Sequence, residues 1–132
     1  MAEVTPFKQC PLCARVWTSL SDFVLDTALL VHGYQAHFTE PEQGLIVVTH
    51  EVEGCGTTLA LRAELVRALY DGPEYTEHLT GTVQCNELCL QAHLLIPCDA
   101  PCDMAWVREA LQWLLRHELP PHLCAAAAPV GA

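Results

Sequence analysis

Short runs rich in apolar, β-branched and aromatic residues are separated by polar turn segments in the first half of the chain, and this pattern predicts a small antiparallel sheet. Residues 31–38 and 45–50 have the β-branched and aromatic content of strands. The intervening TEPEQG contains the Pro and Gly of a turn, so the two strands are expected to form a β-hairpin. Residues 57–61 are a candidate third strand, reached through the tight GCG at 54–56.

Helical patterns flank these strands. Residues 20–26 predict a short helix with Ser19 as its N-cap, and residues 63–70 predict a second helix. The clearest helix covers residues 103–118, where apolar residues form one stripe and polar residues keep largely to the other side (Val107, Ala110, Leu111 and Leu114 against Arg108, Glu109, Gln112 and Arg116). The chain is therefore predicted to be an α+β protein with a small antiparallel sheet, flanking helices and an amphipathic C-terminal helix.

Length and composition favour one folded unit. The chain has 132 residues, of which 52% are hydrophobic and 17% are charged, so disorder over most of its length is excluded. Residues 1–119 are predicted to form a single metal-binding domain. Residues 120–132 contain the low-complexity CAAAAPVGA and are predicted to be a disordered tail.

The charge balance restricts the class of partner. Six Lys and Arg against sixteen Asp and Glu give a formal net charge of −10, which repels DNA and RNA, and no local basic stripe offsets it. No apolar stretch is long enough to cross a bilayer, and the N-terminus lacks the pattern of a secretory signal. We therefore expect a cytoplasmic, acidic protein with a protein partner, and no binding to nucleic acid or membrane.

Eight cysteines in a reducing compartment are more typical of ligands, catalytic thiols or core residues than of a disulfide framework. Cys10 and Cys13 lie in CPLCAR, where two residues between the thiols allow a tight turn to direct both sulfurs at one ion. The segment HEVEGCG supplies His50 at the end of a predicted strand and Cys55 before a glycine. Together CPLC and HEVEGCG resemble the two halves of a zinc-ribbon or zinc-knuckle site, which implies a four-ligand zinc centre.

This resemblance departs from the usual pattern at two places. Ala14 stands where the first knuckle commonly has Gly, and the second half is H-x4-C instead of C-x2-C. These departures leave the identity of the third ligand open. The alternative is that Cys10 and Cys13 are reduced core thiols and that His50 is an ordinary histidine at a strand end.

A second group of cysteines is formed by two C-x3-C pairs, with His93 as an alternative ligand (Cys85, Cys89, Cys98 and Cys102). On a helix, residues i and i+4 share one face, so each pair would present two sulfurs together. Three interpretations remain open: thiolates around a zinc ion or an iron–sulfur cluster, reduced buried thiols, or disulfides. The pairs also resemble the disulfide-linked helical hairpins of small intermembrane-space chaperones, although Pro97 and Pro101 interrupt a continuous helix here.

The sequence as a whole is similar to small cysteine-rich bacterial proteins, a resemblance that implies no activity. We predict a metal-binding protein in which zinc is structural, acting as a binding or regulatory module for another protein. The alternative function is an iron–sulfur or thiol-based electron carrier or sensor using the second group of cysteines. An enzyme would require a site with three protein ligands and an open coordination position.

Overall fold

The computed structural model describes residues 6–79, 82–85 and 87–123, and it has the predicted α+β architecture. Two small antiparallel sheets are combined with α-helices and 3₁₀ turns. In chain order the elements are β1 (Lys8–Gln9), β2 (Val16–Trp17), α1 (Leu20–Leu25), β3 (Leu29–Gln35), η1 (Pro41–Gln43), β4 (Leu45–His50), β5 (Thr58–Arg62), η2 (Ala63–Leu69), η3 (Leu88–Leu90) and α2 (Ala105–Arg116).

The central sheet has the strand order β3-β4-β5, with both pairs antiparallel, so the predicted hairpin and third strand are confirmed. The register of β3 against β4 shifts between Val31 and Gly33, which marks a β-bulge. Just beyond this bulge, the backbone N–H of Tyr34 donates to the carbonyl of Ala92 at 2.8 Å. This bond attaches the segment that contains the second group of cysteines to the free edge of β3.

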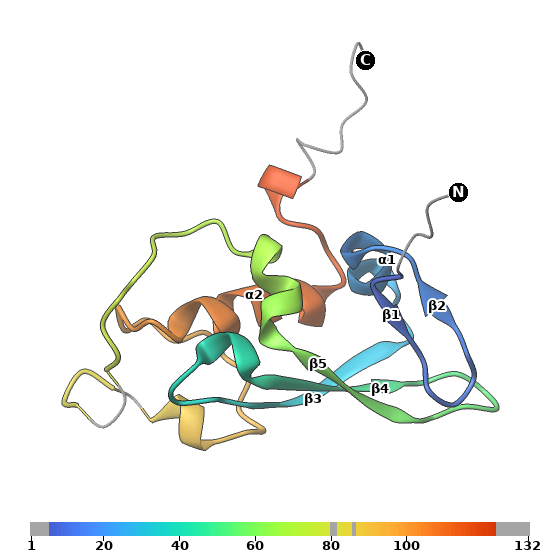
Figure 1. The fold of residues 1–132 in the computed structure, drawn as a ribbon, viewed down its shortest axis with the longest axis horizontal. Coiled ribbons are helices and arrows are strands. Elements are labelled where there is room, and N and C mark those ends of the chain that lie inside the picture. Colours follow the sequence, from blue (N-terminus) through green and yellow to red (C-terminus); the bar gives the residue numbers. More distant parts are fainter. Residues whose placement is uncertain (1–5, 80–81, 86, 124–132) are drawn as a thin grey trace, which may run out of the picture.

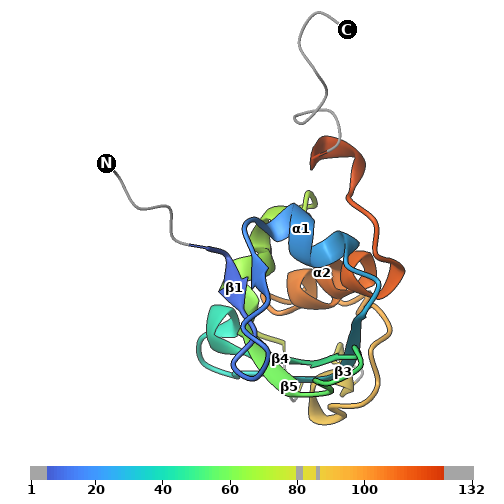
Figure 2. The same ribbon diagram turned by 90° about the vertical axis from the view of Figure 1, so that its right-hand side faces the viewer.

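Helices α1 and α2 cover one face of the three-stranded sheet (Figures 1 and 2). The sheet contributes alternate buried residues to this interface, including Ile46, Val48 and Leu61, each fully buried. From α2, Val107 and Leu111 are fully buried in the same core. The opposite positions of β5 are exposed, and Leu45 and Val47 of β4 are half-buried.

The two predicted helices that frame the sheet are confirmed. The first begins after Ser19, whose hydroxyl accepts a hydrogen bond from the N–H of Asp22 at 3.2 Å. The second, α2, ends at His117 in a left-handed conformation. The prediction of a helix at 63–70 was only partly right, because residues 63–69 form 3₁₀ turns that follow β5 directly, without a side-chain cap.

One residue of α2 was assigned to the wrong side. Arg108 was expected among the polar residues facing away from the core, but its side chain is fully buried. The chain from 88 to 96 folds over this side of the helix, and the guanidinium group donates hydrogen bonds to the backbone carbonyls of Leu88, Leu94 and Ile96. A long cation on the border of the apolar stripe can therefore belong to the interior when backbone acceptors surround it.

The β1–β2 hairpin was not predicted. Each strand has only two residues, which is too short for a visible alternation of polar and apolar positions. Its position is nevertheless fixed, because Trp17 in β2 is fully buried and packs edge-on against Phe23 of α1, with ring centroids 5.2 Å apart. The hairpin is thus held against the main core.

The predicted tail lies mostly beyond the residues that the structure describes. Within the described part, Leu123 packs against the main core, and His122 Nε2 lies 2.7 Å from the carbonyl oxygen of Ala68. Residues 124–132, including Cys124, lie outside the described residues. None of the helices within residues 6–79, 82–85 and 87–123 combines the length and apolar character needed to span a membrane.

Candidate metal centre

The first half of the candidate site is the turn between β1 and β2. Cys10 directly follows β1, and its N–H donates to the carbonyl of Arg15 at 2.8 Å while its carbonyl accepts from the N–H of Ala14 at 3.1 Å. These bonds close a tight turn in which Ala14 adopts a left-handed conformation, with φ of 66°. The turn leaves Cys10 buried and Cys13 exposed.

The second half is the loop between β4 and β5. His50 is the last residue of β4, and its carbonyl accepts hydrogen bonds from the N–H groups of Val52 and Gly56, both at 3.0 Å. Gly54 and Gly56 have φ of 85° and 71° on either side of Cys55. The glycine that follows Cys55 thus adopts a positive φ, which glycine does without steric cost.

The two halves meet at their side chains. The Cys10 and Cys55 sulfurs are 3.6 Å apart, and the Cys13 sulfur lies 3.5 Å from Nδ1 of His50. All four potential ligand atoms lie within 4.8 Å of one another. At Zn–S distances near 2.3 Å, tetrahedral coordination places sulfurs roughly 3.8 Å apart. The arrangement is thus close to what one four-coordinate ion requires.

Backbone donors around the sulfurs favour a thiolate. Burial by itself raises the pKa of the Cys10 thiol, but hydrogen bonds from the backbone N–H groups of Cys13 and Leu12, with side-chain contacts to His50 and Cys55, lower this pKa to about 6. At Cys55 a backbone hydrogen bond from Thr57 favours the thiolate, whereas burial and the neighbouring Cys10 and Cys13 sulfurs oppose it, and the resulting pKa is raised. In the metal-free chain, the thiolate is therefore favoured at Cys10 and disfavoured at Cys55.

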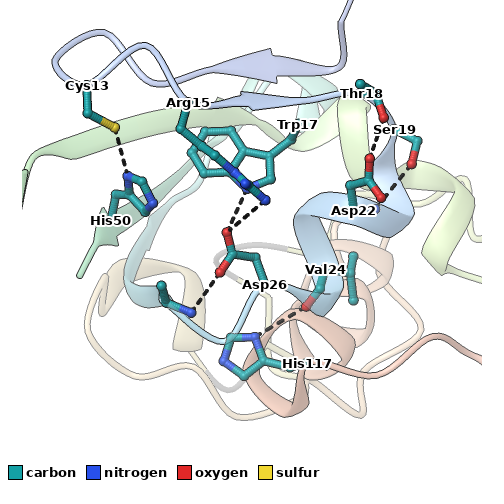
Figure 3. A network of polar contacts seen from close by, with 11 residues as sticks. Cys13, Arg15, Trp17, Thr18, Ser19, Asp22, Val24, Asp26, His50 and His117 are labelled. Atoms are coloured by element: carbon teal, nitrogen blue, oxygen red, sulfur yellow. Dashed lines mark hydrogen bonds and ion pairs between the residues drawn. The ribbon is translucent and has the colours of Figure 1, made fainter. Parts of the chain in front are cut away.

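Residues behind His50 fix the orientation of its ring. The Trp17 and His50 rings meet edge-on with centroids 5.1 Å apart, and the Trp17 indole N–H donates to Asp26 Oδ2 at 2.8 Å. Figure 3 shows the Asp26 carboxylate accepting the hydrogen bond from Trp17 and forming an ion pair with Arg15. The same view shows the sulfur of Cys13 directed at His50. Burial would raise the pKa of the Asp26 carboxyl, but the Trp17 and Ala28 N–H donors and Arg15 lower it. Asp26 thereby anchors the indole that packs on the candidate ligand.

The second group of cysteines is arranged differently. Neither C-x3-C pair lies on an α-helix: Cys89 is in the 3₁₀ turn η3, and the other three are in irregular chain. The expectation that a helical face would present each pair is therefore wrong. The sulfur-bearing residues nevertheless line one small cavity together with apolar side chains (Cys85, Cys89, Cys98, Cys102, Leu79, Ala100, Met104 and Ala105).

Ligand atoms of this second group are less closely gathered. Among the described residues, no three of these four sulfurs lie within 4.8 Å of one another, and His93 does not join them at that distance. All four are thiols in the structure, not disulfides. The two C-x3-C pairs were expected to lie together, and all four cysteines do line one cavity. The spacing in the sequence did not indicate how far apart their sulfurs would lie.

Tertiary contacts add residues that the sequence analysis missed. His78 Nδ1 lies 2.9 Å from Asp103 Oδ1, and the ligand atoms of His78, Cys102 and Asp103 lie within 4.8 Å of one another. Beside the cysteine cavity, Arg108 is fully buried, and so is Tyr34. No spacing in the sequence connects residues 34, 78 and 108, so only the folded chain reveals their proximity.

Comparison with protein-family models, with curated proteins and with solved structures finds no significant match to this chain.

Replacing Ala14 with glycine is expected to stabilise the protein by about 0.5 to 1 kcal/mol, because glycine relieves the left-handed strain at φ of 66° and loses only part of that gain to the greater entropy of the unfolded chain. The free energy of unfolding, measured by urea denaturation of the metal-free and zinc-loaded chains, tests this. The matched variant Gly56→Ala should lose a similar amount, about 0.5 to 1 kcal/mol, since the same two terms act in the opposite direction. A Cβ at Gly56 meets nothing within 4 Å, so that loss is conformational. Destabilisation by Ala14→Gly would contradict the assignment of strain.

The thiolate at Cys10 predicts a pH-dependent stability for the metal-free chain. The pKa of this thiol is lowered from 9.0 to about 6 on folding, so its contribution is fully present above pH 9 and is lost as the pH falls to 6. Stability measured by urea denaturation under reducing conditions should thus rise from pH 6 to 9. The thiolate absorbance in the ultraviolet should titrate near pH 6 in the wild type and not in Cys10→Ser. A flat stability profile that is unchanged by Cys10→Ser would contradict the prediction.

Proposed function

We propose that this chain is a zinc-binding protein in which Cys10, Cys13, His50 and Cys55 hold one structural Zn²⁺. The observation that carries the proposal is the approach of three sulfurs and one imidazole nitrogen to within 4.8 Å of one another. Three thiolates and one imidazole are a ligand set typical of structural zinc, and they suit a borderline-soft ion better than Mg²⁺ or Ca²⁺.

Hydrogen bonds to the sulfurs support the same ion. The N–H groups of Leu12, Cys13 and Thr57 donate to the sulfurs of Cys10 and Cys55, which spreads the negative charge of a thiolate-rich centre. The Trp17 indole packs edge-on against the ring of His50, and the Asp26 carboxylate holds that indole in place. The residues present therefore fit a zinc ion with both its ligands and their supports.

Zinc at this position would join two hairpins that are distant in sequence. The Cys10–Cys13 turn and the His50–Cys55 loop are connected by a long stretch of chain, and the hairpins that carry them are also joined by a hydrogen bond from Lys8 Nζ to the carbonyl of Ala60 at 2.9 Å. Metal binding is then coupled to folding, and structural zinc contributes on the order of 10 kcal/mol in small zinc domains. Four protein ligands also leave no position for a substrate or an activated water.

A closed metal site points to binding as the protein's activity. With a net charge of −10, the chain would attract a partner that carries basic groups and repel nucleic acid. We infer a binding or regulatory module whose partner is a protein, with zinc maintaining the surface it recognises. Such an association should weaken as salt concentration rises.

The proposal predicts that His50→Ala removes one equivalent of zinc per chain. Zinc is measured by elemental analysis after purification under reducing conditions, and the site is probed by replacing zinc with Co²⁺, whose visible spectrum reports tetrahedral thiolate coordination. The matched control is His32→Ala, which removes an exposed histidine from the same sheet. Cys13→Ser should behave like His50→Ala, because it removes the ligand that faces Nδ1.

Chelation should also lower the melting temperature of the wild type and of His32→Ala by more than that of His50→Ala, which has already lost this ion. Equal zinc contents in His50→Ala and His32→Ala would show that the four residues do not bind metal. A cobalt spectrum that changes when azide or cyanide is added would show an open coordination position, and the structural role would then be wrong.

A further inference from the structure

The small cavity lined by Cys85, Cys89, Cys98 and Cys102 has a chemical character that the first site does not explain. Its remaining lining is apolar, with Leu79 and Met104 among the buried residues. Three of the four cysteines are only half-buried, so they are poor candidates for plain core residues. Four sulfurs around one apolar cavity form a cage of soft ligands.

The charge beside this cavity is unbalanced. Arg108 is fully buried, and within the described part of the chain no carboxylate forms an ion pair with it. Its hydrogen bonds to three backbone carbonyls supply dipoles but no negative charge, and its Nε has no hydrogen-bond partner among the described residues. A buried cation without a counter-charge is costly, so an anionic group nearby would stabilise the fold.

A second buried donor lies in the same place. The Tyr34 hydroxyl is buried and has no hydrogen-bond partner among the described residues. Its ring lies beneath the guanidinium of Arg108, 5.5 Å from Cζ to the ring centroid. Burial raises the pKa of the phenol, and the neighbouring Cys89 and Cys102 sulfurs add to this shift. An unsatisfied buried hydroxyl destabilises the fold, and an acceptor drawn toward it would recover that loss.

Backbone groups already donate to two of the sulfurs. The N–H of Leu79 lies 3.4 Å from Cys102 Sγ, and the N–H of Glu87 lies 3.3 Å from Cys85 Sγ. Donors of this kind stabilise metal-bound thiolates. The same two-residue offset as between Glu87 and Cys85 occurs in the first site, where Thr57 donates to Cys55.

We propose that Cys85, Cys89, Cys98 and Cys102 form a second, tetrathiolate metal centre, whose negative charge is partly offset by buried Arg108. Four thiol protons are released to solvent as the sulfurs bind the metal. The resulting centre is negatively charged and supplies a counter-charge for the guanidinium group of Arg108. Its occupant is a thiophilic metal, either one Zn²⁺ or an iron–sulfur cluster, since both are held by four thiolates. The centre is separate from the zinc site of the proposed function.

The sulfur spacing gives the second centre a different affinity from the first. Its ligand atoms are more widely spaced than the four of the first site, which lie within 4.8 Å of one another. A single ion must therefore draw the side chains inward, and that rearrangement costs binding energy. For one chain titrated with zinc, the first equivalent should fill the Cys10 site and the second should bind at least tenfold more weakly.

The full chain, prepared without oxygen, tests the proposal by metal content and cysteine protection. Zinc, iron and sulfide are quantified, and thiols are alkylated and mapped by mass spectrometry. Protection of all four cysteines is expected, with a second zinc equivalent or with iron, sulfide and a visible absorption band. Cadmium substitution gives a readout that needs no variant: two ¹¹³Cd resonances, one shifted as expected for four sulfur ligands and one for three sulfurs and a nitrogen.

Variants separate this centre from its neighbours. Cys89→Ser should lose the second metal and keep the first, whereas His50→Ala should do the reverse, so failure of either proposal is recognised independently. Cys124→Ser is the matched control for the loss of one thiol. Removal of the second metal by His78→Ala would overturn the tetrathiolate assignment in favour of the His78–Asp103 group. Rapid alkylation of the four cysteines in metal-loaded chain would overturn it as well.

Tyr34→Phe is expected to act only on the metal-bound form. Removing a hydroxyl that has no hydrogen-bond partner among the described residues should leave the stability of the metal-free chain unchanged or raise it. The affinity for the second metal should fall about three- to tenfold, which corresponds to the loss of one hydrogen bond. Competition with a chromophoric chelator measures that affinity. Equal affinity for wild type and Tyr34→Phe would exclude the hydroxyl as a donor to the centre, and a large loss of metal-free stability would show that it already has a partner.

Discussion

Burial of one face of the three-stranded sheet is the constraint on which the rest of the structure depends. Ile46, Val48 and Leu61 are fully buried only because α1 and α2 lie across them. Placing α1 there also brings Trp17 into the core beside His50. Placing α2 there brings Arg108 against the backbone of the cysteine-containing segment. The hydrophobic packing therefore positions both groups of potential ligands without using the metal itself.

The two groups lie at opposite ends of the sheet and differ in how far the fold prepares them. His50, the last residue of β4, pairs with Leu29 of β3 at one end of the sheet. Tyr34 of β3 pairs with Ile46 of β4 toward the other end. At the first end two tight turns with left-handed residues direct short side chains at one point. At the other end the sulfurs come from irregular chain and surround a cavity. Tight turns fix side-chain direction, and so they produce the closer ligand set.

Most of the fold could be predicted from the sequence, because strands with alternating burial and a helix with an apolar stripe carry their signals locally. The hairpin, the third strand, the cap at Ser19 and α2 all follow from short-range patterns. The β1–β2 hairpin could not be predicted, since two-residue strands have no period. The 3₁₀ turns at 63–69 resemble an α-helix in composition and differ in their hydrogen bonds, which join residues three positions apart instead of four.

The sequence by itself identified CPLC and HEVEGCG as two candidate half-sites, because two residues between Cys10 and Cys13 place both thiols in one turn, and a strand end followed by GCG is a local feature. Their pairing followed from a resemblance, which left the third ligand open. Only the tertiary structure decided that His50 faces Cys13, that Ala14 takes the left-handed conformation, and that Arg108 is buried. Each of these depends on contacts between segments tens of residues apart. Whether a side chain meets a ligand, a carbonyl or solvent is a property of what packs against it, which no local pattern records.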